Sequence, residues 1–210
     1  GLPGRDEYID NYCKTIERLG QAGVKVICYN FMPVFDWTRS DLFKPRADGA
    51  TVLAYDQAVI DKITDPQDFA DRIQQGAGEF EMAGWEPERM AEIKHLFAQY
   101  QSVSHEDLFR NLRYFLEAVI PVCERYDVKM AIHPDDPPWD IFGLPRICTN
   151  RDNVTRILSL VDSPCNGLTL WLHGLQSLQR YPRHGAGIRE PGAHPLRPCA
   201  QHQVYRARPI

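Results

Sequence analysis

The sequence lacks long hydrophobic runs. No stretch of about 18 consecutive apolar residues occurs in the 210-residue chain, which excludes an ordinary membrane-spanning helix. The first residues, Gly1 to Asp6, include neither an initiator methionine nor the apolar core of a signal peptide. Apolar residues still make up 43% of the chain, enough for one domain with a sizeable core. We therefore expect a soluble, cytoplasmic protein whose sequence begins partway through a gene.

The six cysteines lack paired spacing. No Cys-x-x-Cys pair occurs, and several cysteines fall within apolar periodic segments, where a reduced thiol acts as a small hydrophobe. This usage again indicates a reducing, cytoplasmic setting.

The last forty residues lack lysine and almost all acidic side chains. Residues 171–210 hold six arginines and Glu190, a net charge of +5, whereas the first 170 residues hold 18 basic and 27 acidic groups, a net charge of −9. The basic segment shows no organised stripe, aromatic platform or amphipathic period, so we predict neither a nucleic-acid nor a membrane partner. Its four irregularly spaced histidines favour solvated coil over a metal tract. We predict one domain over residues 1–170 and a disordered tail over 171–210.

Amphipathic helices alternate with short buried strands in the first 170 residues, which predicts the α/β class. Residues 56–100 are predicted to form a helical insertion, and residues 41–49 a mobile or hairpin loop before a strand over 51–55. The order of the remaining elements is that of about three βα units joined by right-handed crossovers. The expected helices are 6–20, 104–126 and 149–162, and the expected buried strands are 24–29, 128–133 and 168–172.

The loop after the first predicted strand is dense in aromatic, amide, acidic and basic groups. It runs from Tyr29 to Arg39 and has the composition of a pocket lining. A hydrophobic loop that plugs the sheet edge, with Asp36 and Arg39 paired, would have the same composition. The residues alone leave both interpretations open.

A histidine and two carboxylates follow the second strand, in the stretch Ala131 to Pro138. Pro134 cannot continue a strand, so His133 is held at the strand terminus. Residues at the carboxyl ends of strands line the active-site mouth of an α/β barrel, so this stretch indicates a metal or acid–base site. A capped loop without ligands is the structural alternative.

Two long motifs resemble those of the mannonate dehydratases. They span residues 26–39 (VICYNFMPVFDWTR) and 130–138 (MAIHPDDPP), and Gly143-Leu144-Pro145-Arg146-Ile147 lies behind the second. The resemblance runs to Leu170 and implies a partial TIM-type (β/α)8 barrel. It also implies a lyase that removes water from D-mannonate to give 2-dehydro-3-deoxy-D-gluconate in glucuronate catabolism, with Mn²⁺ or Fe²⁺ as cofactor.

Site residues follow from the same resemblance. His133 matches a metal ligand of the family, and Asp135 and Asp136 match acidic motif positions expected to act in catalysis, orient the ligand shell or contact sugar hydroxyls. The first motif implies the substrate-binding residues, among which Arg39 suits a carboxylate. These residues are Tyr29, Asn30, Asp36, Trp37 and Arg39.

The chain departs from the family pattern after Leu170. Trp171 stands where the family has a metal-binding cysteine, which leaves one expected ligand in this chain. We hypothesise a frameshift or mis-joined gene at this boundary, and expect an incomplete and inactive copy; the other two reading frames would test the hypothesis. The alternatives are a non-catalytic sugar-acid binding module and, by fold analogy alone, a sugar isomerase. The sequence leaves open whether the chain forms a homo-oligomer.

Overall fold

The computed structural model describes residues 3–63, 68–69, 71, 92–100 and 102–170. The chain divides into two compact units. The first unit consists of Gly1–Phe31, His105–Pro138 and Ile147–Ile210, and the second of Met32–Ser104 and Trp139–Arg146. The predicted tail, 171–210, lies outside the described residues.

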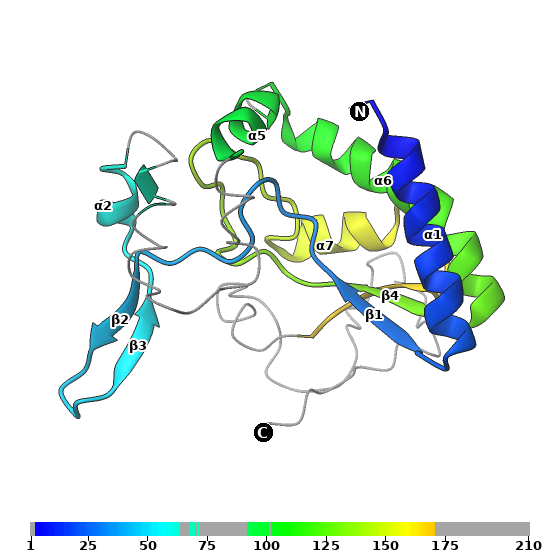
Figure 1. The fold of residues 1–210 in the computed structure, drawn as a ribbon, viewed down its shortest axis with the longest axis horizontal. Helices are drawn as coiled ribbons and strands as arrows, with labels where there is room; N and C mark the ends of the chain where they lie inside the picture. The colour runs from blue at the N-terminus through cyan, green and yellow to red at the C-terminus, as the bar shows by residue number, and fades with distance from the viewer. Residues whose placement is uncertain (1–2, 64–67, 70, 72–91, 101, 171–210) are drawn as a thin grey trace, which may run out of the picture. The chain divides into compact units, whose positions relative to one another are not determined.

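Three parallel strands form the sheet of the first unit, in the order β1-β4-β5 (Figure 1). Strand β1 spans Val26–Tyr29, β4 spans Lys129–Ile132 and β5 spans Asn166–Leu168. Neighbouring strands in the sheet are also successive among these strands in the chain, which is the arrangement of consecutive βα units. The predicted α/β class with a parallel sheet is therefore confirmed.

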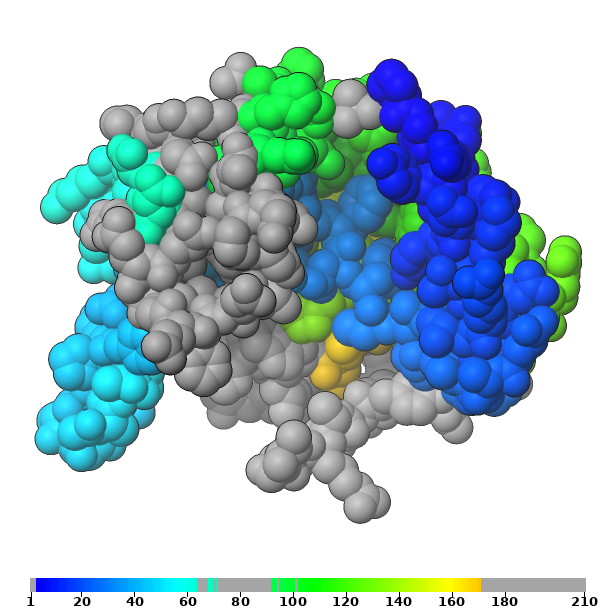
Figure 2. Space-filling view, in the orientation of Figure 1, coloured from blue at the N-terminus to red at the C-terminus, as the bar shows by residue number. Residues whose placement is uncertain are grey.

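Three helices supply the core that covers this sheet. Helix α1 spans Arg5–Gln21, α6 spans His105–Tyr126 and α7 spans Arg151–Leu158. Figure 2 shows α1 in blue at the surface, with α6 in green beside it. One apolar cluster joins these helices to the strands, and its fully buried members include Ile16, Leu112, Leu116, Met130 and Ile157. The predicted helices therefore exist because their apolar faces pack on the sheet.

Asn150 caps helix α7, as its place before the apolar period predicts. Its side-chain oxygen accepts a hydrogen bond from the Asn153 N–H at 2.9 Å. An N-terminal N–H without an intrahelical partner is thereby satisfied.

The third strand begins earlier than predicted, because Asn166 and Gly167 belong to β5 and not to a turn. Asn166 is buried, and its amide lies within hydrogen-bond distance of the carbonyls of Ile157 at 3.1 Å and of Leu158 and Val161 at 3.3 Å. These carbonyls lie at and after the end of α7, where the last carbonyl groups of a helix have no intrahelical N–H donor. A residue typical of turns is therefore stable in a buried strand.

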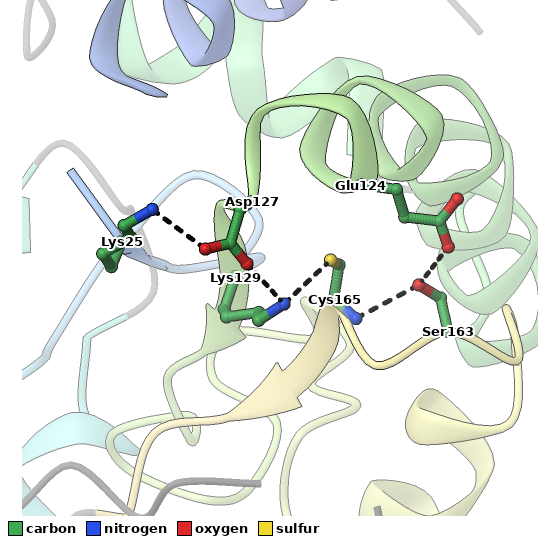
Figure 3. A network of polar contacts seen from close by, with 6 residues as sticks. All are labelled: Lys25, Glu124, Asp127, Lys129, Ser163 and Cys165. Atoms are coloured by element: carbon green, nitrogen blue, oxygen red, sulfur yellow. Dashed lines mark hydrogen bonds and ion pairs between the residues drawn. The ribbon is translucent and has the colours of Figure 1, made fainter. Parts of the chain in front are cut away.

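Polar contacts connect the amino-terminal ends of the three strands (Figure 3). Asp127 lies between Lys25 and Lys129, with carboxylate–ammonium distances of 2.9 and 3.2 Å. Hydrogen bonds from Lys25 and Lys129 lower the pKa of Asp127 below its usual value. Lys129 also lies 3.5 Å from the sulfur of Cys165, just before β5. Ion pairs therefore connect residues beside this edge of the sheet.

The second unit contains an antiparallel hairpin, which confirms a hairpin in the region predicted to be a hairpin or mobile loop. Strand β2 spans Asp41–Pro45 and β3 spans Thr51–Ala54. Helix α2 spans Gln57–Ile60 and α5 spans Ile93–Tyr100. Most of the predicted helical insertion between α2 and α5 lies outside the described residues. The unit has its own core, which includes Phe35, Phe69, Phe97, Ile141 and Leu144.

Among the described residues, the structure can be compared with the expectations about membrane-spanning helices and about cysteines. None of their helices combines the length and apolar character needed to cross a membrane. Burial raises the pKa of the Cys123 thiol to about 12. The described cysteines are all free thiols: Cys13, Cys28, Cys123, Cys148 and Cys165.

Candidate functional site

The carboxyl ends of the three parallel strands lie side by side in the first unit. The His133 N–H donates to the Tyr29 carbonyl at 2.8 Å, which joins the ends of β4 and β1. The Thr169 N–H donates to the Ile132 carbonyl at 2.8 Å, which joins the ends of β5 and β4. Ligands of open α/β sheets bind outside this edge. The predicted histidine therefore lies where the fold favours chemistry.

Side-chain alternation along β4 decides which way His133 points. Met130 and Ile132 are 0% and 1% exposed and belong to the apolar core with the helices. Successive strand side chains point to opposite faces, so Ala131 and His133 lie on the face away from the helices.

The neighbouring strand ends contribute small polar side chains to this same face. The Cys28 sulfur lies 3.2 Å from the Thr169 hydroxyl oxygen, which also donates to the Ala131 carbonyl at 3.1 Å. Cys28 alternates with Tyr29, which is buried on the helix side. The side chains of Cys28, Ala131 and Thr169, which share the face that carries His133, are thus all small.

The His133 ring is fixed in one tautomer. Its Nδ1 lies 2.7 Å from the Pro134 carbonyl oxygen. A carbonyl oxygen can only accept a hydrogen bond, so Nδ1 carries the proton and donates it. In the neutral ring Nε2 then holds the lone pair, and an Nδ1–H donated to a backbone carbonyl is the usual support of a metal-binding histidine. The geometry fits the predicted role of His133 as a ligand.

The two adjacent carboxylates have different surroundings. Asp135 is 1% exposed, and its Oδ2 accepts a hydrogen bond from the Cys148 N–H at 2.7 Å. The Asp135 N–H in turn donates to the Cys148 carbonyl at 3.0 Å. Asp136 is half-buried. Asp135 therefore ties the turn after β4 to the segment before α7, while Asp136 is the more accessible acid.

Tyr29 and Asn30 lie at the end of β1 but in different environments. The Tyr29 side chain packs in the helix-side core, its ring centroid 6.0 Å from that of Phe115. Its hydroxyl has no hydrogen-bond partner among the described residues, and burial raises the pKa of Tyr29. Asn30, one residue beyond the strand, is exposed. Their contact with substrate stays a prediction.

Asp36, Trp37 and Arg39 belong to the second unit. All three side chains are half-buried. The loop is anchored by Phe35, which precedes Asp36, and by Thr38, which precedes Arg39; both are 0% exposed. Arg39 donates to the Thr38 carbonyl at 2.8 Å, and its guanidinium carbon lies 5.8 Å from the Trp37 ring centroid. The predicted substrate residues of this loop therefore lie together on one anchored segment.

The structure groups the predicted site residues by unit. Asp36, Trp37 and Arg39 share the second unit. Within the part of the chain that the structure describes, no group of three His, Cys, Asp or Glu side chains could hold a metal ion. A catalytic zinc site, for comparison, has about three protein ligands, so His133 alone is not a complete set. The first unit contains the others: Tyr29, Asn30, His133, Asp135 and Asp136.

Sequence reasoning missed Arg146, a buried arginine in the second unit. It is 1% exposed and contacts the loop that carries Asp36. Its position in the sequence could have indicated burial, because this charged residue stands between Gly143-Leu144-Pro145 and Ile147. A charged side chain in such an apolar run requires buried partners.

Comparison with known proteins places these motifs in a family. The family described as D-mannonate dehydratase (UxuA) matches residues 1–179. Mannonate dehydratase of Brachyspira hyodysenteriae is 57% identical over 177 residues, which are 84% of this chain and 50% of that protein. The Geobacillus thermodenitrificans enzyme is 59% identical over 170 residues, which are 81% of this chain and 46% of that protein.

A solved structure agrees with the sequence comparison. The crystal structure of mannonate dehydratase from Streptococcus suis matches with a TM-score of 0.67 and 45% identity, over 80% of this chain and 42% of that chain. The chain thus spans about half the length of the curated relatives it matches. With a family match over most of its residues, the chain belongs to the mannonate dehydratase family of hydro-lyases.

Proposed function

We propose that this chain is an incomplete copy of an enzyme that dehydrates D-mannonate to 2-dehydro-3-deoxy-D-gluconate, in glucuronate catabolism. The observation that carries the proposal is His133, which stands at the carboxyl end of β4 with Nδ1–H donated to Pro134. It lies within residues 1–179, the part of the chain that matches the family. The cytoplasmic setting and a homo-oligomeric assembly remain predictions.

The parallel sheet is, in this proposal, a section of a (β/α)8 barrel. The order β1-β4-β5 and the covering helices α1, α6 and α7 support this interpretation, as does the similarity to the Streptococcus suis structure. In such barrels the catalytic groups stand at the carboxyl ends of the strands. His133 occupies that position.

The proposed cofactor is Mn²⁺ or Fe²⁺. His133 fits such an ion as one imidazole ligand, and we propose that the family's other ligands have no counterpart in this chain. A divalent ion at this site would stabilise the negative charge that develops when the proton next to the carboxylate leaves. The described residues provide no complete ligand set, so no further step is assigned to the ion.

Other residues of the chain are proposed to position His133, to transfer a proton and to bind the substrate. Asp135 holds the His133 turn through its hydrogen bonds with Cys148, while the half-buried Asp136 is the accessible group for proton transfer or a sugar hydroxyl. Arg39 suits the substrate carboxylate because a guanidinium can donate two parallel hydrogen bonds. Asp36 and Trp37 lie on the same loop as Arg39 and remain proposed substrate-binding residues, as do Tyr29 and Asn30 at the end of β1.

The test combines metal uptake with turnover. The purified chain is dialysed against Mn²⁺, its metal content is measured, and D-mannonate is added while mass spectrometry follows loss of water. We expect His133→Ala to lower metal uptake, and His105→Ala, an exposed histidine at the start of α6, to leave it unchanged. Equal metal uptake in both variants and wild type would contradict the role of His133. Mannonate binding without metal or turnover would support a binding module instead.

A further inference from the structure

A buried arginine joins two loops of the second unit. Arg146 is 1% exposed, and its Nη2 donates to the carbonyl oxygens of Phe35 at 3.0 Å and Asp36 at 3.1 Å. Arginine is rarely fully buried, and a buried guanidinium persists when its donors meet acceptors. These carbonyls belong to the main chain at the start of the loop that carries Asp36, Trp37 and Arg39.

The guanidinium projects from a turn that is itself fixed. The Arg146 N–H donates to the Asp140 carboxylate at 2.9 Å. Ile141 and Leu144 exchange main-chain hydrogen bonds, of 3.3 and 2.9 Å, and both side chains are 2% exposed. Arg146 therefore starts from a defined backbone position, which a long side chain needs if it is to hold another loop in place.

The contacted loop has a backbone that needs such support. Val34 has a φ of 61°, in the left-handed region that β-branched residues strongly avoid. The next residue, Phe35, donates its N–H to the Pro33 carbonyl at 2.7 Å, and its ring packs against Phe97 with centroids 5.5 Å apart. Strained backbone persists where surrounding contacts determine it, and the guanidinium bonds directly after Val34 are contacts of this kind.

We infer that Arg146 is a positioning residue for the substrate loop. It holds the main chain at Phe35 and Asp36, so that Asp36, Trp37 and Arg39 keep one arrangement. This inference rests on the proposed function for the identity of the substrate, but the positioning itself is a property of the second unit. The two can therefore be tested separately.

Hydrogen exchange measures the positioning without substrate. Amide exchange of residues 34–39 is followed by mass spectrometry in wild type, Arg146→Ala, Arg146→Lys and the control Arg46→Ala, which removes an exposed arginine from the hairpin of the same unit. We expect Arg146→Ala to speed exchange in this loop by about tenfold or more, while α6 exchanges as in wild type. Arg146→Lys keeps the charge, but its side chain ends one bond short of the Nη2 position that contacts both carbonyls, so it should also exchange faster than wild type.

Chemical rescue separates a local role from general loss of stability. Removal of the buried side chain in Arg146→Ala leaves a space for a small guanidinium ion. Ethylguanidinium at low millimolar concentration should slow exchange of residues 34–39 again, whereas ethylammonium should not. Wild-type exchange of the loop in Arg146→Lys would overturn the inference, as would faster exchange throughout the chain that ethylguanidinium does not reverse.

Turnover distinguishes failure of the inference from failure of the proposed function. If the chain dehydrates D-mannonate, Arg146→Lys should raise KM by about tenfold with metal content unchanged, because loop position affects substrate contacts. An unchanged KM would overturn the inference. If wild type does not act on D-mannonate, the proposed function fails, while the exchange and rescue results still decide the role of Arg146.

Discussion

Replacement of Asp135 tests whether the acidic turn after β4 is held by its carboxylate. The Asp135→Ala variant removes the acceptor of the Cys148 N–H, a 2.7 Å bond between residues that are 1% and 2% exposed. Water cannot readily replace the lost acceptor there. The main-chain bond from the Asp135 N–H to the Cys148 carbonyl remains.

The expected loss follows from the burial of this donor. A buried N–H left without an acceptor costs about 1–3 kcal/mol. We therefore expect Asp135→Ala to lower the free energy of unfolding by about 2 kcal/mol. Asp135→Asn keeps an acceptor oxygen and should lose about half as much.

Urea unfolding followed by circular dichroism measures the effect. Asp10→Ala is the matched control, because it removes an exposed carboxylate paired with Lys14 and should change stability by less than about 0.5 kcal/mol. An Asp135→Ala variant as stable as the control would refute the reasoning. Metal uptake provides a second reading, since Asp135→Asn should retain it better than Asp135→Ala if the turn positions His133.

Three further substitutions test the packing, the electrostatics and the first predicted substrate residue. Gly20→Ala should lower the free energy of unfolding by about 1–3 kcal/mol, since the added Cβ would lie 2.6 Å from the Tyr126 Cβ; a stability gain in urea unfolding would contradict this. Hydrogen bonds from Arg156 lower the pKa of Glu106 below 4.5, so Glu106→Gln should reduce Tm above pH 4.5, and the difference from wild type should vanish as pH falls through the lowered pKa. A difference that grows in acid would contradict that assignment. Tyr29→Phe removes a buried hydroxyl without a described partner, so unfolding should be unaffected, and any loss of turnover would mark a substrate contact.

Local sequence patterns predicted helix α6 and strands β1 and β4. Helix α6 continues through Pro121, which removes one main-chain donor, because the apolar side chains before and after it pack continuously in the core. The expected end at Tyr126 is therefore confirmed. Strands β1 and β4 were also predictable, since short runs of apolar residues bounded by turn signals indicate strands of a covered parallel sheet.

The start of β5 was not predictable from local patterns. Asn-Gly is a strong turn signal, yet Asn166 lies buried in the strand with its amide within hydrogen-bond distance of carbonyls up to nine residues earlier in the sequence. The favourable interactions come from the end of α7, and local propensity carries no information about them. Tertiary contacts here override a local preference.

The same distinction applies to the candidate site. His133 could be predicted because a His-Pro pair at a strand end is a local signal. The partner of Asp135 lies 13 residues away, and the carbonyls bound by Arg146 lie 111 and 110 residues away. Sequence spacing therefore identified a candidate ligand, whereas the residues that hold the surrounding turns became visible only in the fold.

The two ends of the parallel sheet serve different needs. At the amino-terminal end, Asp127 contacts Lys25 and Lys129, so the charges there compensate one another. At the carboxyl end, His133 directs Nδ1–H to its own turn, which leaves Nε2 as the basic atom of the ring. Exposed ion pairs of this kind contribute little to the stability of a fold. The described sheet thus has an ion-paired cluster beside one edge and the predicted metal ligand His133 at the other edge.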